Sequence, residues 1–131
     1  MSKIVVNCEL LEIPLGVIPS AGKSVNFPNN QNIFNGKVTS IEVQSGLSYA
    51  PSGAAAVQDF SSLYCTILEK GGRQRLTRYP FQRINPGLYI GQEILFENIS
   101  IDPQKCTVFI APNSGLADNQ SLIVLFYYNN D

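Results

Sequence analysis

Residues 63–79 read LYCTILEKGGRQRLTRY, and this stretch decides the fold. Apolar and polar side chains alternate on both sides of Gly71-Gly72, which is the period-two pattern of half-buried strands. A Gly-Gly pair tolerates the positive φ angles of a type I′ turn, whose twist suits a two-residue hairpin loop. The spacing therefore predicts an antiparallel hairpin with these cross-strand pairs: Ile67 with Leu76, and Tyr64 with Tyr79.

Short runs of the same kind follow along the rest of the chain. Eight Pro and ten Gly interrupt the sequence and leave no room for a long helix. Only GAAAVQDFSS at 53–62 has the composition for one or two helical turns. About eight or nine short strands predict an all-β antiparallel β-sandwich, single jelly-roll-like, that forms one domain over residues 1–131. Outside the hairpin, the expected strands lie at 4–13, 37–45, 88–97, 105–111 and 120–128.

The composition argues against catalysis. The chain has 131 residues, a net charge of −1 and only 15% charged side chains, compared with about 25% in an average protein. It contains no His and no Trp, which removes every catalytic triad built on histidine and every imidazole metal site. The ten carboxylates are scattered, and no two of them form an obvious acid–base pair. We therefore expect a non-enzymatic protein with no metal and no cofactor.

The three cysteines, Cys8, Cys65 and Cys106, lie in apolar runs and form no CxxC pair. We expect all three to be reduced thiols that pack in the core. The first residues lack the pattern of a signal peptide, and no run approaches the ~20 apolar residues of a membrane span. These observations predict a protein made in the cytoplasm without a membrane span.

A basic segment, KGGRQRLTRYPFQR at 70–83, contains five of the nine positive charges, together with Tyr79 and Phe81. Arginine with aromatic residues on a strand pair suits nucleic acid, whereas charges on a hairpin edge also prevent edge-to-edge strand pairing. The alternation places Arg75 and Arg78 on opposite sides of the strand, and the whole chain is slightly acidic. A protein contact is therefore the preferred interpretation, and we do not expect nucleic acid as a partner.

Amides are the second compositional feature. The chain contains twelve Asn and eight Gln, and NFPNNQNIFN at 26–35 is the densest cluster. Individual Asn residues fill turns because they tolerate left-handed backbone. A large amide content also suits wet polar interfaces between subunits, or loops that touch sugars.

Residues 13–44, IPLGVIPSAGKSVNFPNNQNIFNGKVTSIEVQ, combine an Ala-Gly-Lys-Ser entry, an apolar strand to a Phe-Pro corner, an amide-rich turn and a strand built on Val38, Ile41 and Val43. This quarter of the chain resembles the opening strands of jelly-roll capsid proteins from tailless icosahedral phages. The resemblance implies a virion structural role. The length fits one jelly roll, which suits a penton, a minor capsid component, a capsid-decorating protein or the base of a spike.

The sequence thus predicts a homo-oligomeric subunit, a trimer or pentamer, located in the virion and in contact with other virion proteins. A carbohydrate-binding, lectin-like module, with a role in receptor binding, is the alternative. Tyr49, Tyr79 and Tyr89 would then replace the missing Trp as stacking platforms for a glycan. The residues expected to contact partners are Arg73, Arg75, Arg78, Tyr79, Phe81 and Arg83 on the hairpin segment, and Asn29, Asn30 and Asn32 in the amide loop.

Overall fold

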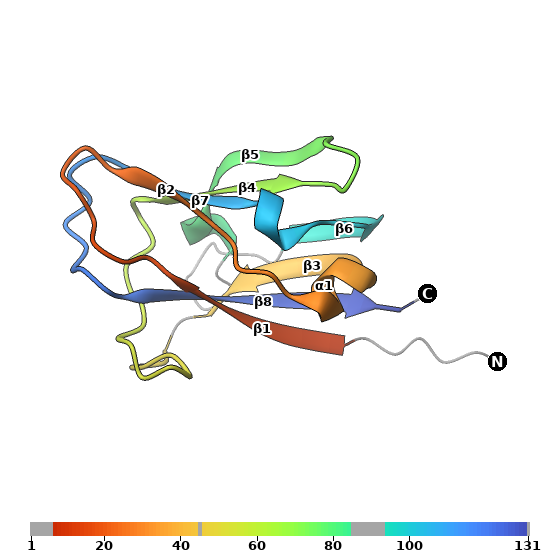
Figure 1. Ribbon diagram of the computed structural model, residues 1–131, viewed down its shortest axis with the longest axis horizontal. Coiled ribbons are helices and arrows are strands. Elements are labelled where there is room, and N and C mark those ends of the chain that lie inside the picture. The colour runs from red at the N-terminus through yellow and green to blue at the C-terminus, as the bar shows by residue number, and fades with distance from the viewer. Residues whose placement is uncertain (1–6, 45, 85–93, 131) are drawn as a thin grey trace.

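A computed structural model describes residues 7–44, 46–84 and 94–130 and shows two antiparallel four-stranded sheets stacked as layers (Figure 1). The first sheet has the order β1-β8-β3-β6 and the second the order β2-β7-β4-β5. Over these described ranges, short helical segments occur only in the connections. The elements are β1 (Asn7–Pro14), β2 (Lys23–Asn26), α1 (Gln31–Asn35), β3 (Lys37–Val43), β4 (Leu63–Leu68), β5 (Gln74–Pro80), η1 (Phe81–Ile84), β6 (Ile94–Ile99), η2 (Pro103–Lys105), β7 (Thr107–Ile110) and β8 (Ser121–Asn129).

The strand pairing is nested. β1 pairs with β8, β2 with β7, β3 with β6 and β4 with β5, and every pair is antiparallel. This is the pairing of one long hairpin wrapped into two sheets, the jelly roll. The predicted all-β sandwich is therefore confirmed.

The core fills the space between the two sheets. Every second residue of β4 is buried, and the inward-facing positions of β7 and β8 meet them. Phe126 of β8 packs edge-on against Phe27, with ring centroids 6.1 Å apart. Burial of apolar surface on the inner faces is the main term that holds a sandwich together.

The hairpin is present, and its loop differs from the prediction. Ile67 lies opposite Leu76 as expected, whereas Tyr64 pairs with Pro80 and Tyr79 with Cys65. The loop has three residues: the Gly72 amide donates to the carbonyl of Glu69, and the Glu69 amide donates to Arg73. Of the two glycines only Gly72 has a positive φ, at 92°, which is typical of a turn followed by a bulge. The longer loop and the two register shifts in the pair displace Tyr64 by one residue from its predicted partner.

The helix prediction was wrong. Residues 53–62 form no helix, and the five-residue helix α1 lies instead in the amide cluster. Its N-cap is Asn30, whose side-chain oxygen accepts from the Ile33 amide at 3.0 Å. The short strand β2 was absent from the strands expected from alternation alone. The predicted strand at 88–97 is described only from Ile94, and its earlier residues lie outside the described part.

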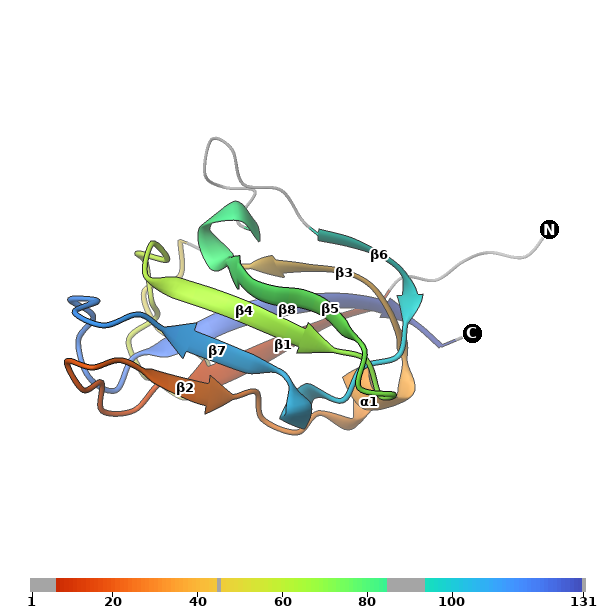
Figure 2. The same ribbon diagram turned by 90° about the horizontal axis from the view of Figure 1, so that it is seen from above.

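The connections gather at two ends of the sandwich. Pro14 pairs with Ser121 and Val43 with Val124, so the ends of β1 and β3 meet the start of β8. The connections 15–22, 44–62 and 111–120 therefore share one end, called here the loop end (Figure 2). The β4–β5 turn, α1 and η2 lie at the other end (Figure 2). Within the described residues, no helix has the length and apolarity needed to cross a membrane.

Candidate functional site

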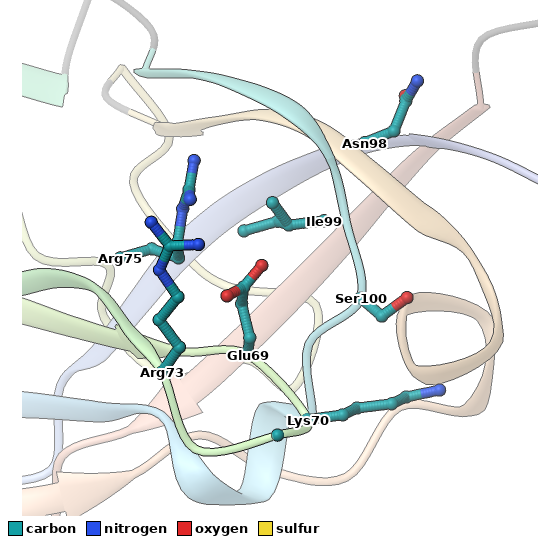
Figure 3. Close-up of a pocket in the computed structure, with 8 residues that line it drawn as sticks. Glu69, Lys70, Arg73, Arg75, Asn98, Ile99 and Ser100 are labelled. Carbon is teal, nitrogen blue, oxygen red and sulfur yellow. The ribbon is translucent and has the colours of Figure 1, made fainter.

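The two sheets meet at one edge of the sandwich, beside the hairpin turn. β5 and β6 end their respective sheets, and they approach each other where the Lys70 amide donates to the Ser100 carbonyl at 2.9 Å. A bridge between Glu69 and Ile101 closes the same point. Next to it a hollow of about 510 Å³ opens, which we call the basic hollow (Figure 3). Its lining residues are Glu69, Lys70, Gly71, Arg73, Arg75, Asn98, Ile99 and Ser100.

Local irregularity of β5 positions the two arginines. Leu76 pairs with Ile67 and Gln74 with Leu68, so Arg75 is an extra residue without a partner in the register. Such a bulge re-aims a side chain at the edge of a sheet. Arg73 lies directly after the turn, and both side chains extend into the basic hollow (Figure 3).

The charged groups around the hollow have different surroundings. The side chains of Lys70 and Ser100 point away from the arginines in Figure 3. The Lys70 ammonium lies 3.8 Å from the centroid of the Phe34 ring, and Lys37 Nζ donates to Ser100 Oγ at 2.7 Å. The carboxylate of Glu69 points up into the hollow (Figure 3). The hollow therefore presents two guanidinium groups and one carboxylate.

The other predicted hairpin contacts are dispersed. Arg78 lies over the Phe109 ring at 4.2 Å, on the outer face of the second sheet, and so lies apart from Arg75, which lines the hollow. Tyr79 is half-buried against the core, and Arg83 is exposed on η1. Phe81 is fully buried, which corrects its assignment as a partner contact: an aromatic ring with no exposed surface cannot touch another protein.

The amide loop, residues 26–35, makes hydrogen bonds within the molecule. Asn30 caps α1 and also donates to Glu9 Oε1 at 3.0 Å, and Asn32 donates to Glu9 Oε2 at 3.4 Å. These bonds tie α1 to the start of β1. Asn29 is exposed. Two of the three predicted contact residues in this loop therefore have intramolecular partners.

The loop end contains a hydrogen-bonded cluster around a single carboxylate, Glu12, that the sequence did not reveal. Glu12 accepts hydrogen bonds from the Ser52 amide, from the Ser52 hydroxyl and from Ser121 Oγ, the last at 2.8 Å. Desolvation acts to raise the pKa of Glu12, but these serine hydrogen bonds lower it below its ordinary value. Since the partners are 40 and 109 residues away, no local motif announces them. The cluster fixes the 44–62 connection to β1 and β8.

The loop end is ordered by further bonds. The Ile18 amide donates to Asp118 Oδ1 at 2.9 Å, the Asn119 amide to the Gly16 carbonyl, and the Asn113 amide to the Ser20 carbonyl. On this framework Val17 and Tyr49 are 64% and 67% exposed. The sequence did not identify Val17 as an exposed residue, because the exposure of a loop side chain depends on the conformation of the loop.

The cysteines divide into two groups. Cys65 and Cys106 are buried, as predicted, and desolvation raises the pKa of Cys106 to about 11 and that of Cys65 well above its ordinary value. Cys8 is exposed, so its prediction was wrong: β1 turns Leu11 and Ile13 to the core and Cys8 to the outer face. No group of three or more acidic or cysteine side chains able to hold a metal occurs among the described residues.

Comparisons with known proteins add no relative. No family model matches the chain, and searches of curated proteins and of solved structures gave no match.

Proposed function

We propose that this chain is a non-enzymatic structural subunit of a phage particle: a penton, minor capsid, decorating or spike-base protein. It acts by contacts with copies of itself and with other virion proteins. The resemblance of residues 13–44 to phage jelly-roll proteins supports the viral role, and the nested strand pairing agrees with it. Fold alone does not define function, so the proposal depends on the surface through which the chain would contact its partners.

The observation that carries the proposal is the loop end. Its connections are bonded to one another and to the sheet, so the surface is pre-organised and loses little freedom on binding. Val17 and Tyr49 project from it, and Leu47 is 36% exposed in the same region. Tyrosine and aliphatic side chains on an ordered surface are typical anchors of protein interfaces.

Native mass spectrometry over a concentration series tests the assembly. We expect a trimer or pentamer in the wild type and a shift toward monomer in the double variant Val17→Ser with Tyr49→Ser. Leu10→Ser is the matched control, because Leu10 is 39% exposed on the outer face of the first sheet, away from the loop end. A wild type that remains monomeric at every concentration would contradict the proposal.

Location in a particle needs its own test. Antibodies against the chain should label purified virions, and the label should follow the particle band through a density gradient. Recovery of the whole protein in the soluble fraction of infected cells would exclude the virion role.

Tyr49 also supports a second function, the carbohydrate-binding module. A ring that is 67% exposed can stack on a sugar face, and the ring itself lies in a connection rather than in the core. Tyr79 is half-buried against the core, and Tyr89 lies outside the described residues. Glycan-array binding that is lost in Tyr49→Ala and retained in Tyr79→Phe would favour this function over assembly.

A further inference from the structure

We propose that the basic hollow binds a phosphate group between Arg73 and Arg75. Arg75 belongs to the edge strand β5 and Arg73 lies directly before it, and both side chains line the same hollow of about 510 Å³ (Figure 3). Ile99 lies across the hollow from them, between Asn98 and Ser100, and is 5% exposed, so the centre of this wall is apolar. An apolar wall lowers the local dielectric and strengthens the attraction between a guanidinium and an anion.

Within the described part of the chain, neither guanidinium group has a partner of its own. Among the residues that the structure describes, no ion pair, side-chain hydrogen bond or ring contact holds the side chain of Arg73 or Arg75. Other cations of the region are occupied: Arg78 by Phe109, Lys70 by Phe34 and Lys37 by Ser100. Two like charges that share a hollow repel each other, and an anion placed between them converts that repulsion into two attractions.

The number of donors selects phosphate over carboxylate. A guanidinium offers a planar fork of N–H groups, and a single fork already saturates one side of a carboxylate. A phosphate presents oxygens in several directions, so it can accept bidentate hydrogen bonds from two forks at once. Of the chemical groups common in ligands, phosphate fits this pair of arginines best.

Glu69 restricts the form of the phosphate. Its carboxylate points into the hollow and reduces the charge supplied by the two arginines to a net +1 (Figure 3). A singly charged phosphate matches this value better than a doubly charged one. Dihydrogen phosphate, which retains two protons, and the phosphodiester of a nucleic-acid backbone both carry one negative charge, so the shared chemistry is a singly charged phosphate. This site is independent of the proposed assembly at the loop end.

Titration calorimetry on the full chain tests the site, with inorganic phosphate and a short single-stranded oligonucleotide as separate probes and chloride as reference at equal ionic strength. We expect Arg73→Gln or Arg75→Gln to weaken phosphate binding about tenfold or more, because each variant removes a charge-assisted pair of hydrogen bonds. Arg83→Gln is the matched control, since Arg83 is an exposed arginine on η1 that does not line the hollow. Glu69→Gln should tighten binding of phosphate, because it removes the repelling carboxylate.

The two probes identify the source of the phosphate. Binding of inorganic phosphate alone assigns a free or small phosphorylated ligand, and binding of the oligonucleotide as well assigns a phosphodiester; both results support the site when they depend on Arg73 and Arg75. Circular dichroism confirms that the variants are folded. Absence of binding to both probes, or an equal loss in Arg83→Gln, would overturn the proposal.

Discussion

β8 and β5 have similar lengths but opposite positions: β8 lies inside its sheet, whereas β5 lies at the edge of the other sheet. β8 has nine residues, pairs with both β1 and β3, and buries seven of its nine side chains. β5 has seven residues, pairs only with β4 among the described residues, shows two register shifts and buries none of its side chains fully. The central strand has its sequence dictated by packing, whereas the edge strand is free to carry charge and irregular backbone. The proposed phosphate site uses this freedom.

The largest expected difference between the two strands is the loss of unfolding free energy when an apolar side chain is truncated. Phe126→Ala should lower the free energy of unfolding by about 3–5 kcal/mol, because it removes a fully buried ring that packs against Phe27. Leu76→Ala in β5 should cost only about 1 kcal/mol, since Leu76 is half-buried at the rim of the core. Urea unfolding followed by circular dichroism gives both values. Equal costs would mean that β5 contributes as much to the core as β8.

A smaller effect concerns Glu12 of β1, whose carboxylate accepts hydrogen bonds from Ser121 of β8 and from Ser52 of the loop end. The folded state lowers the pKa of this carboxyl, so its stabilising effect is fully present above the ordinary value of 4.5 and is lost as pH falls through the lowered value. Glu12→Gln should cost up to about 1 kcal/mol at neutral pH, because it weakens hydrogen bonds to Ser52 and Ser121.

Urea unfolding at neutral pH and in acid checks this link. The difference between wild type and Glu12→Gln should shrink in acid, where the wild-type carboxyl is itself protonated. A difference that stays constant with pH would show that the charge of Glu12 is irrelevant to stability.

The smallest effect concerns the backbone of β5. Thr66 Oγ1 accepts the Arg78 amide at 3.1 Å, where Arg78 has a φ of 46° in the second irregularity of the strand. Thr66→Val keeps the shape and removes the acceptor, and water can replace it at this exposed position, so the cost should be about 0.5 kcal/mol. Thermal unfolding measures it. A loss comparable with that of Phe126→Ala would show that the bulge organises the whole sheet.

The same contrast explains what the sequence could predict. Alternation is strong in 63–79, because burial on one sheet face selects every second side chain, and the Ile67–Leu76 pair followed from it. The strand β8 was predicted from a continuous apolar run instead, as expected for a strand buried on both faces. The bulge at Arg75 could not be predicted, since it depends on a three-residue loop that leaves almost the same residue pattern as a two-residue loop. Cys8 was misplaced because both faces of β1 contain apolar residues.

Part of the candidate site could be predicted from the sequence. The density of arginine in 70–83 identified the segment that lines the hollow. The positions of Arg75 and Arg78 also depend on two irregularities of β5, which the alternation did not predict. The far wall of the hollow comes from Asn98 to Ser100, which only the jelly-roll topology brings to the hairpin. The helix α1 could not be predicted for another reason. Asparagine is common both in turns and at helix N-caps, and only the residues that follow it distinguish the two.

Amide hydrogen exchange tests the contrast between β8 and β5 most directly, because exchange reports local opening along each strand. We predict that the amides of β8 exchange slowest, at the rate of global unfolding, and that those of β5 exchange much faster through local opening. Added phosphate should slow exchange in β5, and also in β8, because a ligand that binds only the folded chain stabilises it against global unfolding. Equal protection of the two strands, together with no response of β5 to phosphate, would contradict this account.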